Sequence, residues 1–217
     1  EMIEGFDSFN QVPQYLMEKL YSNDRTWRIV ETCHNIWFNP NNDKLYHPDA
    51  YLFCTPWHLE NTFKSMPSPK YLSNYPIEDL RVSKEDKIES MTKLGLSLDK
   101  KHIVNVGLWT HGKNQKEGIE IARLLEHSHP EYQFHFIGNQ APNFKDYWEP
   151  IMQNLPSNVS VWGERADVEV FLKSADVFMF NSTWECSPIV LKEAISYGIP
   201  ILSRNLEQYV GTYNNYI

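Results

Sequence analysis

Hydrophobic residues in the second half of the chain occur in short runs that alternate with helical patterns. The runs predict buried strands at residues 102–107, 132–138, 159–163, 177–180 and 199–202. The intervening patterns predict helices at residues 114–127, 144–155, 168–174 and 188–197. Strands that alternate with helices pair in parallel, because each right-handed crossover places a helix on a sheet face. This half of the chain is therefore predicted to be a doubly wound α/β domain.

Three of these predicted strands end in glycine, at Gly107, Gly138 and Gly163. In doubly wound sheets, ligands bind outside the carboxyl ends of the strands. Glycine there lets another group approach the backbone closely, although a tight turn between strand and helix calls for glycine equally. The strand ends are candidates for a binding site, with turn formation as the alternative.

The first part of the chain has a different pattern. It predicts strands at residues 28–33 and 51–54, a helix at 57–63, a polar loop at 39–44, and a linker with prolines at 67–69 and 74–76. We divide the chain into a partial N-terminal domain at residues 1–75 and a C-terminal domain at residues 76–217 that lacks its end. Because the chain begins without Met and stops after its fifth predicted strand, we expect it to be a piece of a longer protein.

Composition narrows the classes of function. Hydrophobic residues make up 41% of the chain and charged residues 22%, as in a soluble globular protein. The net charge of −8 argues against a nucleic-acid partner, which needs clustered Lys and Arg. The 3 cysteines form no Cys-x-x-Cys pair, and the 8 histidines show no His-Glu-x-x-His spacing, so we predict no metal site. No apolar run approaches the roughly 18 residues of a membrane span, and no segment reads as a signal peptide. We expect a cytoplasmic location, with surface association with a membrane left open.

Residues 181–200 carry the densest candidate chemistry. Pro188 is placed where a helix should begin, and Ser187 before it is a good N-cap. The free N–H groups of Ile189, Val190 and Leu191 would then point out of the carboxyl edge of the sheet. Together with the helix dipole, they form a site suited to a diphosphate.

Two carboxylates flank this helix start, Glu185 in the loop and Glu193 about one turn into the helix. Eight residues at helical rise span at most ~12 Å, which is roughly the length of a ribose–diphosphate–sugar unit. One carboxylate could therefore hold each end of such a ligand. The alternative is that Ser187 only caps the helix and both carboxylates are solvated.

The set of motifs in this segment resembles the signature of retaining GT-B glycosyltransferases, the group 1 or family 4-like class. Seven residues separate Glu185 from Glu193, and Ala194 and the stretch Gly198-Ile-Pro200 follow. Residues 174–182 resemble that family's "aDvfv.pS" strand, and residues 161–172 its "v.f.G......l" passage. The match covers about residues 102–204 and is specific as a set. It implies a GT-B fold, with a C-terminal nucleotide-sugar-binding domain and part of an N-terminal Rossmann-like domain.

The resemblance implies a role for each matching residue. Glu193 would hold the nucleotide ribose and Glu185 the donor sugar. The backbone of the helix start would hold the diphosphate and sugar, through Ser187, Pro188, Ile189 and Val190, beside the strand ends at Gly107 and Gly163.

The first loop of the domain departs from the family pattern. The family places an Arg directly after the Gly and a Lys a few residues later, both for the diphosphate. Here Leu108 follows Gly107, so the Arg is missing, whereas Lys113 matches the Lys. His111 and Arg165 are the candidates to compensate.

Residues 29–35 resemble the family's strand that ends in "T.H", whose His faces the donor sugar. This implies a catalytic role for His34 beside Glu185, either in binding the sugar or in stabilising an oxocarbenium-like transition state. A His after an apolar strand is otherwise a satisfied polar group. Trp109 and Trp184 are candidates to stack on a sugar, with core packing as the alternative.

We therefore predict a glycosyltransferase that transfers a sugar from a UDP- or GDP-linked donor, with retention of configuration, to a glycan, lipid or protein acceptor that the sequence does not identify. The nearest approach to the metal-binding Asp-x-Asp of GT-A transferases is Asp167-Val-Glu169. We therefore predict neither a metal nor another cofactor. The alternatives are a GT-B epimerase or phosphorylase, and a catalytically silent sugar-nucleotide-binding module. The missing Arg after Gly107 and the incomplete N-terminal domain leave the silent module open.

Overall fold

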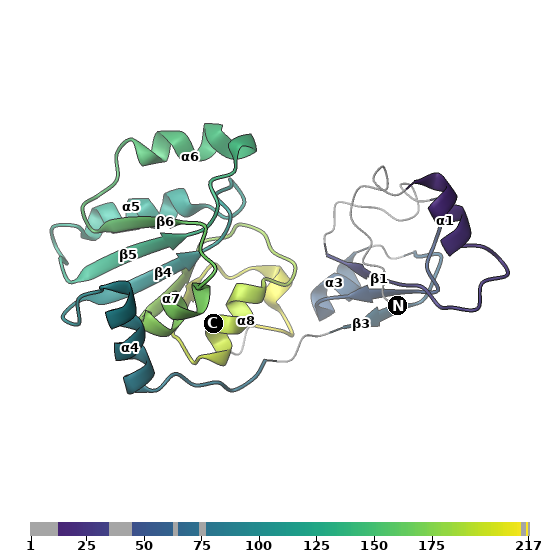
Figure 1. Cartoon of the computed structure of the whole chain (residues 1–217), viewed down its shortest axis with the longest axis horizontal. Helices are drawn as coiled ribbons and strands as arrows, with labels where there is room; N and C mark the ends of the chain where they lie inside the picture. Colours follow the sequence, from purple (N-terminus) through teal and green to yellow (C-terminus); the bar gives the residue numbers. More distant parts are fainter. Residues whose placement is uncertain (1–12, 35–44, 63–64, 74–76, 214–215, 217) are drawn as a thin grey trace. The chain divides into compact units, whose positions relative to one another are not determined.

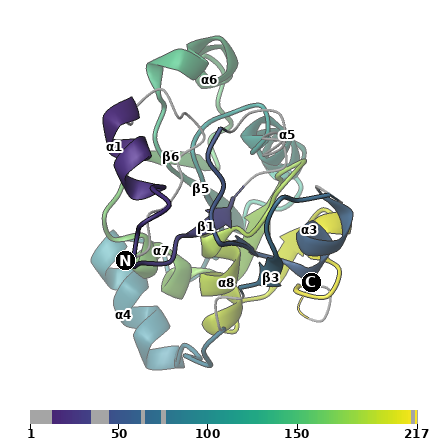
Figure 2. The same ribbon diagram turned by 90° about the vertical axis from the view of Figure 1, so that its right-hand side faces the viewer.

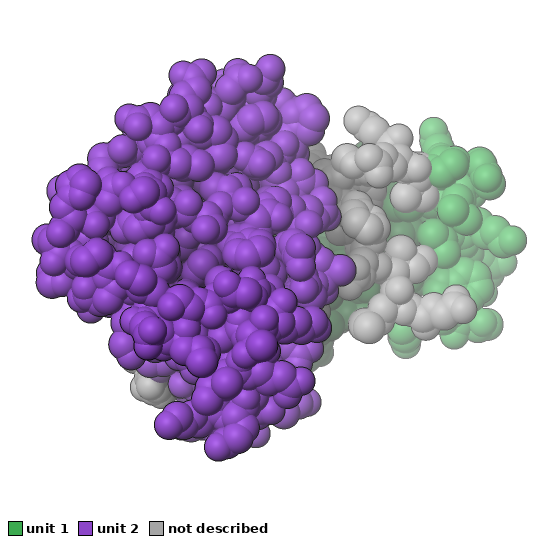
Figure 3. Space-filling model, turned by 60° about the vertical axis from the view of Figure 1, so that its left-hand side comes forward, with its two compact units in different colours: residues 1–76, 207–214 green, residues 77–206, 215–217 purple. Residues whose placement is uncertain are grey.

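The computed structural model describes residues 13–34, 45–62, 65–73, 77–213 and 216. The chain forms two compact units, which are coloured separately in Figure 3. The first comprises Glu1–Pro76 and Glu207–Asn214, and the second Ile77–Leu206 and Asn215–Ile217. Residues 207–214 thus return to the first unit, whereas the sequence analysis placed them in the C-terminal domain.

The first unit contains a three-stranded parallel sheet in the order β1-β2-β3. Its described elements are α1 (Gln14–Leu20), β1 (Val30–Cys33), β2 (Ala50–Phe53), α3 (Pro56–Asn61), β3 (Lys70–Leu72) and the 3-10 helix η3 (Glu207–Tyr209) (Figure 1). Tyr51 and Phe53 are fully buried, as expected for alternate positions of a strand with one face on the core. Helix α3 begins after Thr55, whose hydroxyl accepts a hydrogen bond from the His58 N–H at 3.1 Å.

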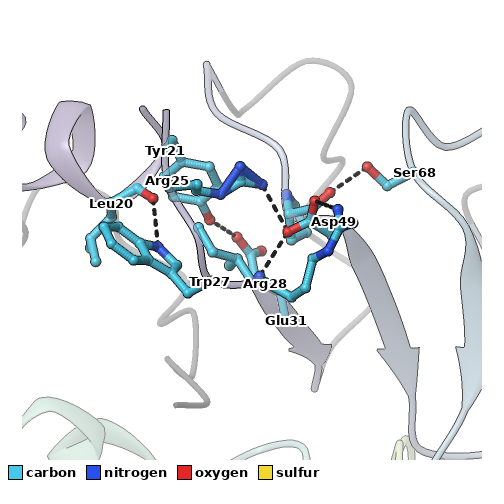
Figure 4. A network of polar contacts seen from close by, with 10 residues as sticks. Leu20, Tyr21, Arg25, Trp27, Arg28, Glu31, Asp49 and Ser68 are labelled. Atoms are coloured by element: carbon cyan, nitrogen blue, oxygen red, sulfur yellow. Dashed lines mark hydrogen bonds and ion pairs between the residues drawn. The ribbon is translucent and has the colours of Figure 1, made fainter. Parts of the chain in front are cut away.

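Asp49 fastens the segment before β1 to the start of β2 (Figure 4). Its carboxylate accepts hydrogen bonds from the Ile29 N–H at 2.8 Å, from Arg25 at 2.8 Å and from Arg28 at 3.2 Å. The Ile29 N–H is the main cause of a lowered pKa for Asp49, and the two guanidinium groups add to it. Tyr21 donates to Glu31 at 2.6 Å and so joins the end of α1 to β1.

Parts of the sequence prediction for this unit need correction. Residues 67–69, predicted as a linker, lead directly into β3, and the Pro69 carbonyl accepts a hydrogen bond from the Tyr51 N–H at 2.9 Å. Helix α1 was not predicted. The predicted polar loop at 39–44 and the second part of the predicted linker, at 74–76, lie outside the described residues.

The second unit is a doubly wound α/β domain with a five-stranded parallel sheet in the order β6-β5-β4-β7-β8. Its strands are β4 (Lys101–Val106), β5 (Tyr132–Ile137), β6 (Val159–Gly163), β7 (Val177–Phe180) and β8 (Ile201–Ser203). Its helices are α4 (Lys84–Leu94), α5 (Gln115–Leu125), the 3-10 helix η2 (Pro142–Phe144), α6 (Lys145–Met152), α7 (Val168–Ser174) and α8 (Ile189–Ser196). The predicted fold class, the five strands and the four helices between them are confirmed.

The helices cover both faces of this sheet. Helices α5 and α6 lie on one face, and α4, α7 and α8 on the other (Figures 1 and 2). This division follows from the strand order, because the chain moves outward from β4 to β6, crosses back to β7, and right-handed crossovers then place the later helices on the opposite face. The core under α5 and α6 is built around buried aromatic and aliphatic side chains, namely Ile103, Trp109, Ile119, Ala122, Phe134, Phe136, Tyr147 and Met179.

Helix α4 was not predicted, although its ends carry clear signals. The Ser83 side chain accepts from the Asp86 N–H, and the Asp86 side chain accepts from the Ser83 N–H, which together form a capping box. Gly95 ends the helix with a φ of 66°, which favours glycine. Few apolar side chains of this helix are buried, and Ile88 is exposed. Its hydrophobic periodicity is therefore weak, which is why the helix was missed.

Candidate functional site

Two loops meet at the carboxyl edge of the five-stranded sheet, one between β4 and α5 and one between β7 and α8. Strands β4 and β7 are neighbours, so both loops leave the sheet side by side. The Thr183 N–H donates to the Gly112 carbonyl at 2.8 Å, and the Asn105 side chain donates to the Met179 carbonyl at 2.9 Å. The two loops therefore form one joined surface.

The glycines at the strand ends have different reasons to be glycine. Gly138 has a φ of 149°, and a Cβ there would lie 1.9 Å from the Gly107 carbonyl oxygen. Gly163 has a φ of 66°, and its carbonyl accepts from the Gly138 N–H at 2.7 Å. Backbone conformation and close approach therefore account for these two glycines. Gly107 is different, because a Cβ there would meet the stem of Lys113 at 3.6 Å and the Gln115 side-chain nitrogen at 3.8 Å, which are ordinary contact distances.

Lys113 and Glu185, both predicted site residues, bind each other across the two loops. The Lys113 ammonium group donates to a Glu185 carboxylate oxygen and lies 5.4 Å from the centroid of the Phe180 ring. The Glu185 side chain is 9% exposed and the Lys113 side chain 31%. The structure thus brings a cation from the β4–α5 loop to a nearly buried carboxylate in the β7–α8 loop.

Glu117, which the sequence analysis did not single out, holds the surroundings of this pair in place. Its carboxylate accepts hydrogen bonds from Asn114 at 3.1 Å, from Asn181 at 3.0 Å and from Arg204 at 2.6 Å. Asn114, the residue after Lys113, has a φ of 53°, a conformation that Asn tolerates better than most residues. Glu117 therefore joins the β4–α5 loop, the end of β7 and the residue that follows β8.

The start of α8 differs from the predicted arrangement. The N-cap residue is Pro188, not Ser187, and no side chain caps the helix. The first backbone bond of the helix runs from the Lys192 N–H to the Pro188 carbonyl at 3.4 Å, so the N–H groups of Ile189 and Val190 precede it. Pro188 has a ψ of 118°, an extended conformation, which is why it lies outside the first helical turn.

Two buried hydroxyl groups lie in the same loop. The Ser182 and Ser187 oxygens have no hydrogen-bond partner among the residues that the structure describes. Buried hydroxyls are normally satisfied, and unsatisfied ones call for a missing partner. Ser182 lies just after β7 and Ser187 just before the N-cap of α8, so both belong to the segment that carries Glu185.

Glu193 lies on an exposed part of α8. Partial burial of its carboxyl group, and secondarily the charge of Glu169 on α7, raise its pKa above the usual value. Glu193 and Glu185 thus occupy different environments, one open to solvent and the other nearly buried beside a cation.

The residues considered as substitutes for the missing Arg have other partners. Arg165 binds both oxygens of Asp167, each at 2.9 Å. His111 packs on Tyr147, with ring centroids 4.7 Å apart, and lies 3.8 Å from the Asp146 carboxylate. Trp109, considered for sugar stacking, is fully buried in the core, 5.7 Å from Phe136 between ring centroids. Trp184 is partly buried in the β7–α8 loop.

His34 directly follows β1 in the first unit and is exposed. The predicted strand that ends before this histidine is present. Its role toward a ligand stays a prediction.

The described residues hold no group of three or more His, Cys, Asp or Glu side chains arranged for a metal ion. Within the same residues, no helix has the length and apolarity needed to cross a membrane.

Comparisons with known proteins agree with this architecture. Residues 86–216 match the family model described as glycosyl transferases group 1. A glycosyltransferase of Methanocaldococcus jannaschii, MJ1059, is 26% identical over 149 residues, which are 67% of this chain and 36% of the relative. A UDP-Gal:alpha-D-GlcNAc-diphosphoundecaprenol alpha-1,3-galactosyltransferase of Escherichia coli is 31% identical over 117 residues, which are 52% of this chain and 30% of that enzyme. The chain thus spans about a third of the length of these relatives.

Solved structures with the same fold include those of HepE and WaaG. Anabaena HepE, in a complex with UDP and glucose, superposes with a TM-score of 0.68 at 18% identity, over 83% of this chain and 54% of that chain. WaaG, a glycosyltransferase involved in lipopolysaccharide biosynthesis, superposes with a TM-score of 0.63 at 18% identity, over 93% of this chain and 65% of that chain. At this identity the likeness establishes the fold, which is GT-B.

Proposed function

Because the chain belongs to the glycosyl transferases group 1 family, we propose that it supplies the donor-binding half of an enzyme that transfers a sugar from a nucleotide donor to an acceptor. The observation that carries this proposal is the pairing of Lys113 with Glu185 next to the start of α8. The resemblance assigned Lys113 to the diphosphate and Glu185 to the donor sugar of one ligand, and the two side chains are in contact although they are 72 residues apart.

Different residues of the site bind different groups of the donor. The Ile189 and Val190 N–H groups and Lys113 face the diphosphate, since both supply positive charge. Glu185 binds hydroxyl groups of the donor sugar, and Glu193 binds the ribose hydroxyls. Stabilisation of the leaving diphosphate by these groups replaces a divalent cation, so transfer proceeds without a metal.

We further propose a UDP-linked donor, with a GDP-linked donor as the alternative to be tested. The E. coli relative is named for UDP-Gal, and HepE was solved with UDP and with UDP-glucose. Retention of configuration is proposed from the resemblance of the Glu185–Glu193 motif to the signature of retaining GT-B glycosyltransferases. The acceptor is a glycan, lipid or protein, and His34 contacts the donor sugar from the N-terminal side.

The experiment is a thermal-unfolding screen with UDP, UDP-glucose, UDP-galactose, GDP and GDP-mannose, followed by calorimetry. A ligand at 100 times its dissociation constant stabilises the folded state by ~2.7 kcal/mol. We expect a UDP compound to stabilise the chain in excess EDTA, and Lys113→Met to remove most of that effect. If no nucleotide or nucleotide sugar shifts the unfolding temperature, the chain is not a donor-binding domain.

A catalytically silent binding module is a second candidate, favoured by Leu108 in place of the family's Arg and by the engagement of Arg165 with Asp167. Release of free sugar from the bound donor distinguishes the two. We expect slow hydrolysis of the donor by the wild-type protein, which Glu185→Gln abolishes. Tight donor binding with no hydrolysis and no transfer would support the silent module.

A further inference from the structure

The Lys113–Glu185 ion pair has a consequence for which ligand the site prefers, and this consequence rests on the proposed function. In this structure each residue is the other's partner. The Glu185 side chain is only 9% exposed, so an ionised carboxylate there depends on a partner. A diphosphate that draws Lys113 away therefore leaves Glu185 without its cation.

A nucleotide sugar and a nucleoside diphosphate affect this pair differently. The donor brings phosphates for Lys113 and sugar hydroxyls, which donate to Glu185, so both members of the pair gain a new partner. The nucleoside diphosphate keeps its ribose but lacks the donor sugar, and its terminal phosphate carries one more negative charge than in the donor. It takes Lys113 but offers no hydrogen-bond donor to the carboxylate that this leaves without a partner.

The surrounding loops are held independently of the pair. Thr183 donates from its backbone to Gly112 at 2.8 Å, and Glu117 binds both Asn114 and Asn181. These bonds remain when Lys113 and Glu185 separate. The exchange of partners therefore takes place between two side chains within a fixed frame.

We propose that the Lys113–Glu185 pair discriminates between donor and product. A nucleotide sugar separates the pair at little cost, because it supplies a new partner for each residue. A nucleoside diphosphate supplies a partner for Lys113 only, so Glu185 competes with it for Lys113. Glu185 is thus a specificity-determining residue that weakens binding of the spent nucleotide and favours its release.

The test compares dissociation constants for UDP and for UDP-glucose or UDP-galactose by calorimetry, in wild type and five variants, one of them Lys113→Met alone, with GDP and GDP-mannose as a parallel series. Glu185→Gln keeps the shape of the side chain and removes its charge. We expect it to tighten UDP binding about tenfold, the effect of removing one charged competitor. Binding of the nucleotide sugar should tighten less or weaken, so the preference for donor over product falls. Glu185→Asp, shorter by one methylene group and still charged, should give a smaller gain in the same direction.

The double variant Lys113→Met/Glu185→Gln separates competition for Lys113 from simple repulsion of the phosphates. We expect Glu185→Gln to give no gain in UDP affinity when Lys113 is already Met. Glu120→Gln, an exposed residue on α5 outside the site, controls for the change in net charge and should leave both affinities unchanged.

The outcomes are distinct. Unchanged or weaker UDP binding in both Glu185 variants overturns the proposal, and so does a gain that persists in the Lys113→Met background. In either case wild-type binding of a nucleotide sugar leaves the proposed function intact. If the wild-type protein binds none of the nucleotides, the proposed function fails, and this inference fails with it.

Discussion

At the scale of single residues, the proposed site depends on two carboxylates, Glu185 and Glu193, that lie in different surroundings. The motif separated Glu185 from Glu193 by seven residues and assigned them to opposite ends of a ligand. Their environments differ as such roles require, because Glu185 is nearly buried beside Lys113 and Glu193 is exposed. The prediction of Ser187 as the N-cap of α8 was wrong. Ser187 is the better capping residue by type, but the extended conformation of Pro188 starts the helix one residue later.

Glu193 provides a test at this scale. We expect Glu193→Ala to weaken binding of the nucleoside diphosphate about tenfold or more, because a hydrogen bond to a charged group contributes ~1.4 kcal/mol or above. The thermal unfolding temperature should stay the same, since the side chain is exposed. Calorimetry with UDP measures the affinity, and Glu120→Ala, at an exposed position on α5, is the matched control. An unchanged dissociation constant removes Glu193 from the site.

A second residue-scale test concerns two buried histidines on neighbouring strands, His102 on β4 and His135 on β5. His135 Nε2 lies 2.9 Å from His102 Nδ1, the Trp162 N–H donates to His135 Nδ1 at 3.1 Å, and His102 Nε2 lies 2.8 Å from the Ser97 carbonyl. The carbonyl requires a proton on His102 Nε2, so His135 donates to His102 and both rings are neutral. Burial, and secondarily His102, lower the pKa of His135 to about 4.

Because the unfolded chain binds the proton more readily than the folded one, this site stabilises the fold fully above pH ~6.5 and progressively less as pH falls toward 4. We expect the free energy of unfolding to fall by about 2–3 kcal/mol over that range on account of His135. His135→Gln should flatten the dependence on pH even though it lowers stability at pH 7. Denaturant unfolding at several pH values measures the slope, with exposed His129→Gln as control. An unchanged slope in His135→Gln contradicts the neutral chain of hydrogen bonds.

At the scale of elements, periodicity predicted the second unit well because its strands are short, apolar and bounded by glycine or polar turns. It predicted parallel strands, but not their order. The contact between Lys113 and Glu185 depends on β4 lying next to β7, and β5 and β6 separate these strands along the chain. No local pattern encodes that adjacency, so the ion pair emerges only from the fold.

The hydrogen bonds of Glu117 also join segments that are far apart in the sequence, so no local pattern predicts them. Their role in binding can be tested. Glu117 joins three chain segments through Asn114, Asn181 and Arg204. We expect Glu117→Gln to weaken UDP binding by about three- to tenfold, because the new amide N–H group faces donors instead of accepting from them and loosens the loop that carries Lys113. Glu120→Gln, less than one turn further along α5, is the control.

Affinity is measured well below the unfolding temperature, so that lost stability does not mimic lost positioning. Arg204→Lys, which keeps a cation for Glu117, should restore most of the affinity lost in Arg204→Ala. Loss of stability in Glu117→Gln with unchanged UDP affinity would assign the network to the fold alone.

At the scale of the whole molecule, the two units carry different parts of the proposed reaction. The second unit holds the helix start, Lys113, Glu185 and Glu193, whereas His34 belongs to the first unit. The sequence resembled the family most closely over the second unit, where the motifs are dense. In the first unit, the resemblance to the family was limited to a strand followed by a histidine. Short strands between polar loops leave weak sequence patterns.

This division predicts how two substitutions differ. His34→Ala should leave the affinity for UDP within about twofold, because the diphosphate is bound by groups of the second unit. The same change should lower the rate of donor turnover roughly 100-fold, the lower end of what a positioned acid, base or polar group contributes. Lys113→Met should lower both UDP affinity and turnover, since its charge meets the diphosphate in the ground state and in the transition state. Calorimetry and the rate of UDP release, measured on both variants side by side, decide the matter. Equal losses of UDP affinity would mean that His34 contacts the phosphates, and turnover unaffected by His34→Ala would exclude His34 from catalysis.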